Sequence, residues 1–146
     1  MASDGRVLFS FVRYWSRRWT GAGFGVDAER GRDVMVVEAV AALTGRGVAA
    51  SVNDVARELG VDQSGASRMV SRAERLGLLA RARPSVVGGA TAISVTGEGR
   101  ELLRAAHAWQ EKVLRTLTAD WSREEVRTLV ELMGRLVEAQ NRIDAR

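Results

Sequence analysis

The chain has 146 residues, of which 46% are hydrophobic and 27% are charged, a composition typical of a folded globular protein. With 22 Lys and Arg against 18 Asp and Glu, its formal net charge is +4, which alone is weak support for nucleic-acid binding. The absence of cysteine and the single histidine exclude disulfides, cysteine nucleophiles and Cys/His zinc sites. No apolar run approaches the roughly 20 residues of a membrane-spanning helix. We expect a single domain, 1–146, without a secretory signal, cofactor, metal or membrane partner.

The positive charge is concentrated in two segments of the chain. Residues 1–32 contain six Arg and three acidic residues, and residues 62–83 contain five Arg and two acidic residues. Residues 33–61 contain two Arg and four acidic residues, which makes this segment negative. A solvated helix face is the ordinary origin of such a cluster, and a surface for phosphate groups is the alternative.

Hydrophobic periodicity predicts four helices in the first half of the chain, over about 4–20, 29–44, 52–59 and 63–76. The first helix carries an aromatic stripe that must pack on the chain's own core or on a partner. Capping and stop signals flank the last two helices: Ser51 with Asp54, Gly60, Asp62 and Gly77.

After the fourth helix the pattern changes to strand. The segments LLARA and ATAISV, separated by Pro84 to Gly89, predict a β-hairpin with a glycine pair at its tip. Thr96 is the expected cap of a fifth helix, about 97–117, and Ser122 with Glu125 predicts the start of a sixth. The apolar residues expected on the inner face of the sixth helix are Val126, Leu129, Val130, Met133, Leu136 and Val137.

The strongest motif is a helix-turn-helix within the stretch SVNDVARELGVDQSGASRMVSRAERLGLL. Ala56 is the small residue expected where the two helices cross, and Gly60 is the turn glycine. The residues predicted to lie inward are Val55, Leu59, Val61, Ala66, Met69, Val70 and Ala73. The residues predicted to point outward are Gln63, Ser64, Ser67, Arg68, Ser71, Arg72 and Arg75.

This outward face, made of short hydrogen-bonding side chains and arginines, suits a helix that lies in the major groove of DNA. The alternative is a pair of helices whose polar side is only solvated. Arg81 and Arg83 lie on the first strand of the hairpin directly after this helix. A hairpin at that place is typical of the wing of a winged helix-turn-helix.

The stretch DVARELGVDQSGASRMVSRAERLGLLAR resembles the helix-turn-helix of the MarR family of bacterial transcriptional regulators. The stretch VTGEGRELL, with Thr96 and Gly99, resembles the family's exit from the wing into the fifth helix. The resemblance covers nearly the whole chain and implies a mainly α fold with a small β-hairpin wing. It implies a winged helix-turn-helix lobe over 33–96 and a helical dimerisation region formed by 1–32 and 97–146.

The resemblance also implies a cytoplasmic homodimer that binds a pseudo-palindromic site on double-stranded DNA and represses transcription until a small molecule binds. The aromatic residues of the terminal helices support a dimer independently, because a partner would cover their apolar stripes. A self-contained bundle is the alternative. The sequence departs from the family in its wing, since PSVVGGATA places no charge between Arg83 and Glu98. We therefore expect specificity to depend on the helix that begins near Gln63.

The predicted DNA-binding residues fall into three groups. Those expected at base edges are Gln63, Ser64, Ser67 and Arg68, and those expected at phosphates are Arg72, Arg75, Arg81 and Arg83. Ser51 and Asn53 are expected to add hydrogen bonds to phosphates. The predicted small-molecule site consists of Arg13, Trp15, Trp19 and Phe24, with packing in the core as the alternative for its aromatic residues. His107 is either a pH sensor or an ordinary helical histidine.

An enzyme is the least supported class, because the sequence contains no G-x-S-x-G motif, metal-ligand spacing or nucleotide-binding glycine loop. The remaining alternative is a winged-helix module that binds protein without specific DNA binding. The operator, the regulated genes, the effector and the sign of regulation stay open at this level.

Overall fold

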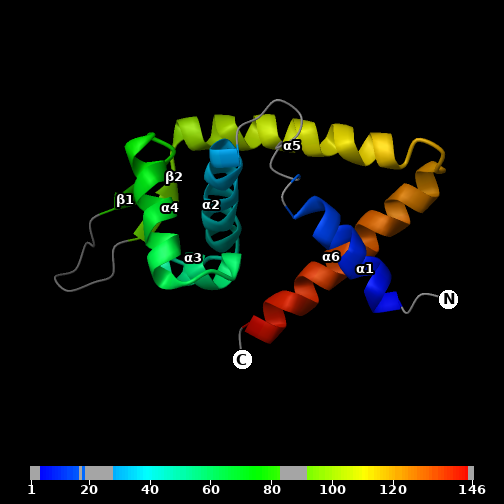
Figure 1. The fold of residues 1–146 in the computed structure, drawn as a ribbon, viewed down its shortest axis with the longest axis horizontal. Coiled ribbons are helices and arrows are strands. Elements are labelled where there is room, and N and C mark those ends of the chain that lie inside the picture. The colour runs from blue at the N-terminus through cyan, green and yellow to red at the C-terminus, as the bar shows by residue number, and fades with distance from the viewer. Residues whose placement is uncertain (1–3, 17, 19–27, 83–91, 145–146) are drawn as a thin grey trace. The chain divides into compact units, whose positions relative to one another are not determined.

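The computed structural model describes residues 4–16, 18, 28–82 and 92–144. The predicted fold class is confirmed, since these residues form helices and one two-stranded antiparallel sheet (Figure 1). In chain order the elements are α1 (Asp4–Trp15), α2 (Ala28–Gly45), α3 (Val52–Leu59), α4 (Gln63–Arg75), β1 (Leu79–Ala82), β2 (Ala92–Val95), α5 (Gly97–Leu117) and α6 (Arg123–Asp144). Among the described helices, none is long and apolar enough to cross a bilayer.

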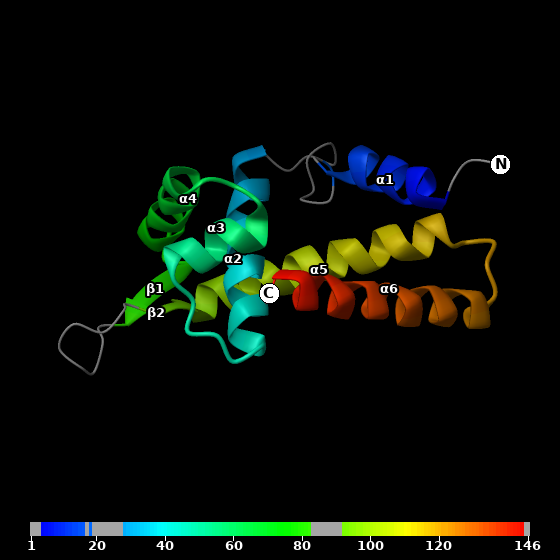
Figure 2. The same cartoon turned by 90° about the horizontal axis from the view of Figure 1, so that it is seen from below.

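The chain divides into two compact units, Met1–Gln110 and Glu111–Arg146, so the boundary falls inside α5. In the first unit, β1 packs beside α4 and β2 packs beside α2 (Figure 2). The strands pair in register from Leu79 opposite Val95 to Ala82 opposite Ala92. The predicted functional division at residue 97 stays a prediction, because compactness does not test it.

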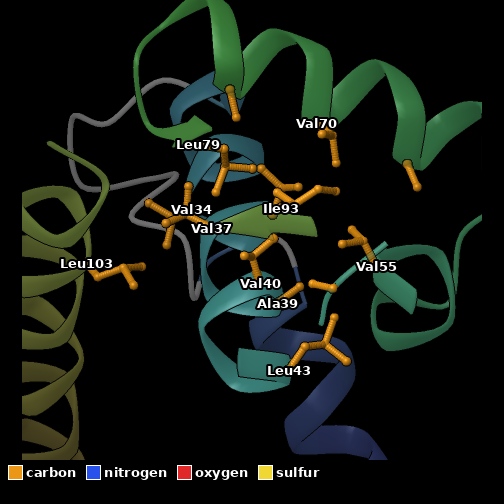
Figure 3. Close-up of a cluster of buried hydrophobic side chains, with 14 of the residues drawn as sticks. Val34, Val37, Ala39, Val40, Leu43, Val55, Val70, Leu79, Ile93 and Leu103 are labelled. Atoms are coloured by element: carbon orange, nitrogen blue, oxygen red, sulfur yellow. The ribbon is translucent and has the colours of Figure 1, made fainter. Parts of the chain in front are cut away.

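The core of the first unit is built around α2, whose apolar residues are nearly all buried. Valine side chains of α2 form one cluster with apolar side chains of α3, α4, the hairpin and α5 (Figure 3). The fully enclosed members are Val36, Val37, Val40, Val55 and Val70. Each such side chain contributes about 1.5–3 kcal/mol relative to an exposed one. A helix that is apolar on several sides belongs in the centre of a fold, which explains the position of α2.

Side-chain caps determine where the helices begin. The Ser51 hydroxyl accepts the backbone N–H of Asp54, and the Asp54 carboxylate accepts the N–H of Ser51, which completes the predicted capping box. Asp62 accepts an N–H from the first turn of α4 at 2.7 Å. Thr96 and Ser122 cap α5 and α6 in the same way. The predicted caps are confirmed, and so are the starts of these four helices.

Two local predictions were wrong. α1 ends at Trp15, not near residue 20, because side chains satisfy its last carbonyls: the Ser16 hydroxyl donates to the Arg13 carbonyl, and the Arg18 guanidinium donates to the Tyr14 carbonyl. Trp19 and the glycine run at 21–23 lie outside the described residues. Val61, predicted to point inward, is 39% exposed because it sits in the turn between α3 and α4.

The apolar side of α6 is uncovered in the single chain. Val130, Met133, Leu136 and Val137 are each between 40% and 52% exposed. The charged residues Arg127, Glu131, Arg135, Glu138 and Arg142 recur at spacings of three and four on the other side of the helix. The predicted apolar side is therefore present, but the single chain does not cover these four residues, and its burial against a partner stays a prediction.

Candidate nucleic-acid interface

The helix-turn-helix forms as predicted, and its turn depends on one glycine. Gly60 ends α3 in the left-handed conformation, with φ 65° and ψ 34°, which residues with a Cβ adopt only with strain. The Val61 N–H then donates to the Ala56 carbonyl at 3.0 Å and turns the chain towards α4. Ala56 is buried where α3 packs on α4, so a larger side chain there would push the helices apart.

One side of α4 packs on the core and the other faces solvent. Ala66, Val70 and Ala73 are buried, as predicted, and Met69 packs against the same cluster. The residues predicted to read base edges lie together over the first two turns: Gln63, Ser64 and Arg68 are exposed, and Ser67 is half-buried.

The arginines near this face fall into two classes. Arg72 is paired with Asp33, with Nε 2.9 Å from Oδ1, and lies within 3.4 Å of Glu29. Arg81, on β1, is paired with Glu74 of α4. In contrast, the guanidinium groups of Arg68 and Arg75 form no ion pair with any other described residue. Arg68 and Arg75 therefore meet solvent without an internal counter-charge.

At the start of α3, the predicted phosphate contacts differ in their environment. The Ser51 hydroxyl donates to the Asp54 carboxylate at 2.6 Å and accepts the backbone N–H of Asp54. Its hydrogen bonds are therefore made within the capping box. These hydrogen bonds from the Ser51 side chain and backbone lower the pKa of Asp54, and Arg57 adds to the effect. Asn53 is exposed.

The wing is described only at its base. Arg81 is exposed on β1, and its contact with Glu74 directs its guanidinium towards α4. Arg83 and the uncharged tip lie outside the described residues, so the phosphate contact expected for Arg83 stays a prediction.

The predicted small-molecule residues are only partly described. Arg13 is exposed on α1 and lines an open depression on that helix together with Trp15. The Trp15 ring is half-buried and lies against the rings of Phe11, Tyr14 and Trp109. Trp19 and Phe24 lie outside the described residues. His107 of α5 is 2.5 Å from the carboxylate of Glu38 of α2, so it joins two helices.

Sequence reasoning missed the acidic partners of the arginines. Asp33, Glu29 and Glu74 received no role, although two of them hold Arg72 and the third holds Arg81. Asp33 and Arg72 are 39 residues apart in the chain, so no local spacing reveals the pair. The only available signal was an acidic residue at the edge of the most apolar helix, where an unpaired charge is costly.

Comparison with known sequences finds a family model that matches part of this chain. Residues 31–88, which include most of α2 and all of α3, α4 and β1, match the sequence profile of the MarR family. A relative from Bacillus subtilis (strain 168), the uncharacterized HTH-type transcriptional regulator YdgJ, is 25% identical over 95 residues. The aligned part spans 65% of this chain and 58% of that protein.

Comparison with solved structures gives the same fold. A MarR family transcriptional regulator from Silicibacter pomeroyi DSS has a TM-score of 0.68 and 17% identity, over 92% of this chain and 87% of that one. PcaV from Streptomyces coelicolor, solved with its natural ligand, has a TM-score of 0.62 and 21% identity, over 95% of both chains. MepR of S. aureus, solved in complex with DNA, has a TM-score of 0.56 and 18% identity, over 91% of this chain and 94% of that one.

Proposed function

We propose that this chain is a member of the MarR family, a family of transcriptional regulators rather than enzymes, and that it binds duplex DNA through the exposed side of α4. The observation that carries the proposal is the pair of unpaired guanidinium groups, Arg68 and Arg75, on a helix whose first turns also expose Gln63 and Ser64. A helix N-terminus with such side chains fits the major groove.

The roles of these residues follow from their chemistry. Arg68 has the geometry to donate two hydrogen bonds to guanine, and Gln63 pairs in the same way with adenine. Each such contact contributes about 1–3 kcal/mol of discrimination between bases. Ser64 and Ser67 add single hydrogen bonds, while Arg75, Arg81, Arg83 and Asn53 approach phosphates and position the helix without reading sequence.

We further propose that the protein acts as a homodimer on a pseudo-palindromic operator. The exposed apolar sides of α1 and α6 support this, because Phe9, Phe11 and Leu136 are each about half exposed or more in the single chain. Surfaces of this kind are covered by a partner in stable proteins. Two copies related by a twofold axis would place two α4 helices about 34–36 Å apart, one turn of DNA.

The last part of the proposal is that the protein represses transcription in the cytoplasm and that a small molecule regulates this repression. PcaV is solved with its natural ligand, and this chain places Arg13 beside the aromatic residues of α1. A guanidinium group next to aromatic rings suits a ligand that is both anionic and aromatic. Such a ligand changes DNA binding only if it prefers one arrangement of the dimer over another.

The test is selection of bound duplexes from fragments of the host genome, followed by affinity measurements over a range of salt. Specific binding that weakens steeply with salt is expected. Arg68→Ala lowers the affinity for the selected duplex at least about fivefold, the lower end for one base contact. The control is Arg104→Ala, which removes the same charge from an exposed site on α5. Failure to bind any duplex at low salt would favour the protein-interaction module.

A further inference from the structure

Among the residues that the structure describes, Asp33 is the only charged one that is buried, with 5% of its surface exposed. It lies near the start of α2, beside the core residue Val34. A carboxylate removed from water is unfavourable unless a positive group compensates it with good geometry. The partner of Asp33 is therefore fixed by strong physical constraints.

That partner is Arg72 of the candidate DNA-binding helix. Its Nε donates to Oδ1 of Asp33 at 2.9 Å, and its Nη2 lies 3.4 Å from Oδ2, so the two planar groups meet side on. The same Nη2 is 3.4 Å from the Glu29 carboxylate. A two-point contact of this kind fixes the direction of the arginine as well as its distance.

Arg72, which holds α4 to Asp33, lies on the same row of the helix as residues proposed to read bases. Ser64, Arg68 and Arg72 are spaced by four, and residues four apart are neighbours on a helix surface. The packing of Ala66, Val70 and Ala73 is made of small side chains, which allow a helix to rotate or slide more readily than large interlocking ones. A rotation of α4 that broke the two-point contact between Arg72 and Asp33 would displace Arg68 as well.

We propose that Asp33, acting through Arg72, is a positioning residue that sets the rotation of α4 on the core and thereby determines the specificity of DNA binding. This inference rests on the proposed function. It replaces the phosphate contact predicted for Arg72 with an internal role, and it makes an acidic residue outside the DNA-binding face necessary for sequence readout.

Charge alone predicts the opposite result, which makes the inference easy to test. Asp33→Asn removes one negative charge from each chain, so simple electrostatics predicts tighter binding to every duplex. A positioning role predicts weaker binding to the selected duplex and no loss on a scrambled one. The informative quantity is therefore the ratio of the two affinities, measured at several salt concentrations.

The experiment compares the full-length protein with Asp33→Asn, Arg72→Lys and the control Glu58→Gln. The control removes the same charge from the Arg46–Glu58 pair, which joins the residue after α2 to α3 and does not involve α4. We expect Asp33→Asn to lower the ratio about tenfold, comparable to one base contact, with an unchanged salt slope. Arg72→Lys keeps the charge but loses the two-point contact with Asp33, so its ratio should also fall below that of the parent. Glu58→Gln leaves it within about twofold of the parent.

A ratio that stays the same or rises in Asp33→Asn would overturn the inference, as would Arg72→Lys with the parent's ratio. The inference would also be overturned by a variant that melts at a lower temperature while its folded form keeps the parent's ratio. The pair would then contribute to stability alone. If Asp33→Asn loses its helical circular dichroism, Arg72→Lys decides the question. A parent protein that prefers no selected duplex over the scrambled one would instead refute the proposed function, and the inference with it.

Discussion

The rings of Trp15 and Trp109 meet edge to face, with centroids 6.4 Å apart and planes inclined by 66°. This contact joins α1 to α5, two helices separated by most of the chain. Edge-to-face pairs contribute about 0.5–1.5 kcal/mol beyond the burial of their surface. Trp15 therefore has a structural role whether or not it also contacts a ligand.

Trp15→Ala should lower the free energy of unfolding by about 2 kcal/mol, because the ring is half-buried and loses both its burial and its ring pair. Trp15→Phe keeps an aromatic ring against Trp109 and should retain most of the stability. Urea denaturation followed by circular dichroism, at one chain concentration, measures both. Equal losses in the two variants would mean that the ring pair is not the cause.

Gly99 should not tolerate a side chain. A Cβ at this position would collide with the backbone carbonyl of Leu78 and would lie 2.8 Å from Cγ1 of Val95. Gly99→Ala is therefore expected to destabilise the protein by about 1–3 kcal/mol, the range for overpacking. Gly97→Ala is the matched control in the same turn, since its Cβ would meet only the Arg100 guanidinium at 3.8 Å.

Thermal unfolding distinguishes the two glycines. Gly97→Ala should leave the protein unchanged or more stable by up to about 1 kcal/mol, because alanine favours helix. A Gly99→Ala variant as stable as the parent would show that α5 can move away from the start of β1.

The Ser51–Asp54 capping box predicts a pH-dependent stability difference. Hydrogen bonds from Ser51 lower the pKa of Asp54 below its unfolded value, so the interaction stabilises the folded state at neutral pH. That stability is lost as the pH falls through the folded pKa, where the carboxylate becomes protonated. Ser51→Ala should cost about 1 kcal/mol at pH values above about 5, and the difference from the parent should shrink in acid.

Urea denaturation of the parent and Ser51→Ala across the acid range measures this difference. Glu125, whose pKa is also lowered by the backbone and side chain of Ser122, is a second acidic group with the same sign. Because Ser51→Ala leaves Ser122 intact, the contribution of Glu125 cancels between the two proteins. A difference that stays constant down to about pH 2 would mean that Asp54 is not the titrating group.

Features fixed by neighbouring residues were predictable from the sequence, and features fixed by distant ones were not. The caps at Ser51 and Asp62, and the turn at Gly60, involve residues at most five apart, so their spacing predicts them. The Asp33–Arg72 pair joins α2 to α4, and only the packing of the two helices brings it together. The exposure of Val61 was mispredicted for a related reason, since a turn residue follows no helical period.

The same limit applies to α6, whose pattern predicts an apolar side but not what covers it. In the single chain this side faces solvent, and Leu136 is 49% exposed. If a second copy covers it, Leu136→Glu places a charge in an apolar interface and should convert the dimer to a monomer at micromolar concentrations. The charge-matched control, Arg135→Gln, lies on the charged side of α6 and should leave the dimer intact. Light scattering gives the mass of each variant, and the predicted dimer is wrong if the unmodified protein already has the mass of one chain.

The Leu136→Glu monomer should also bind the selected duplex at least about 100-fold more weakly while it remains helical, because only a dimer engages two half-sites at once.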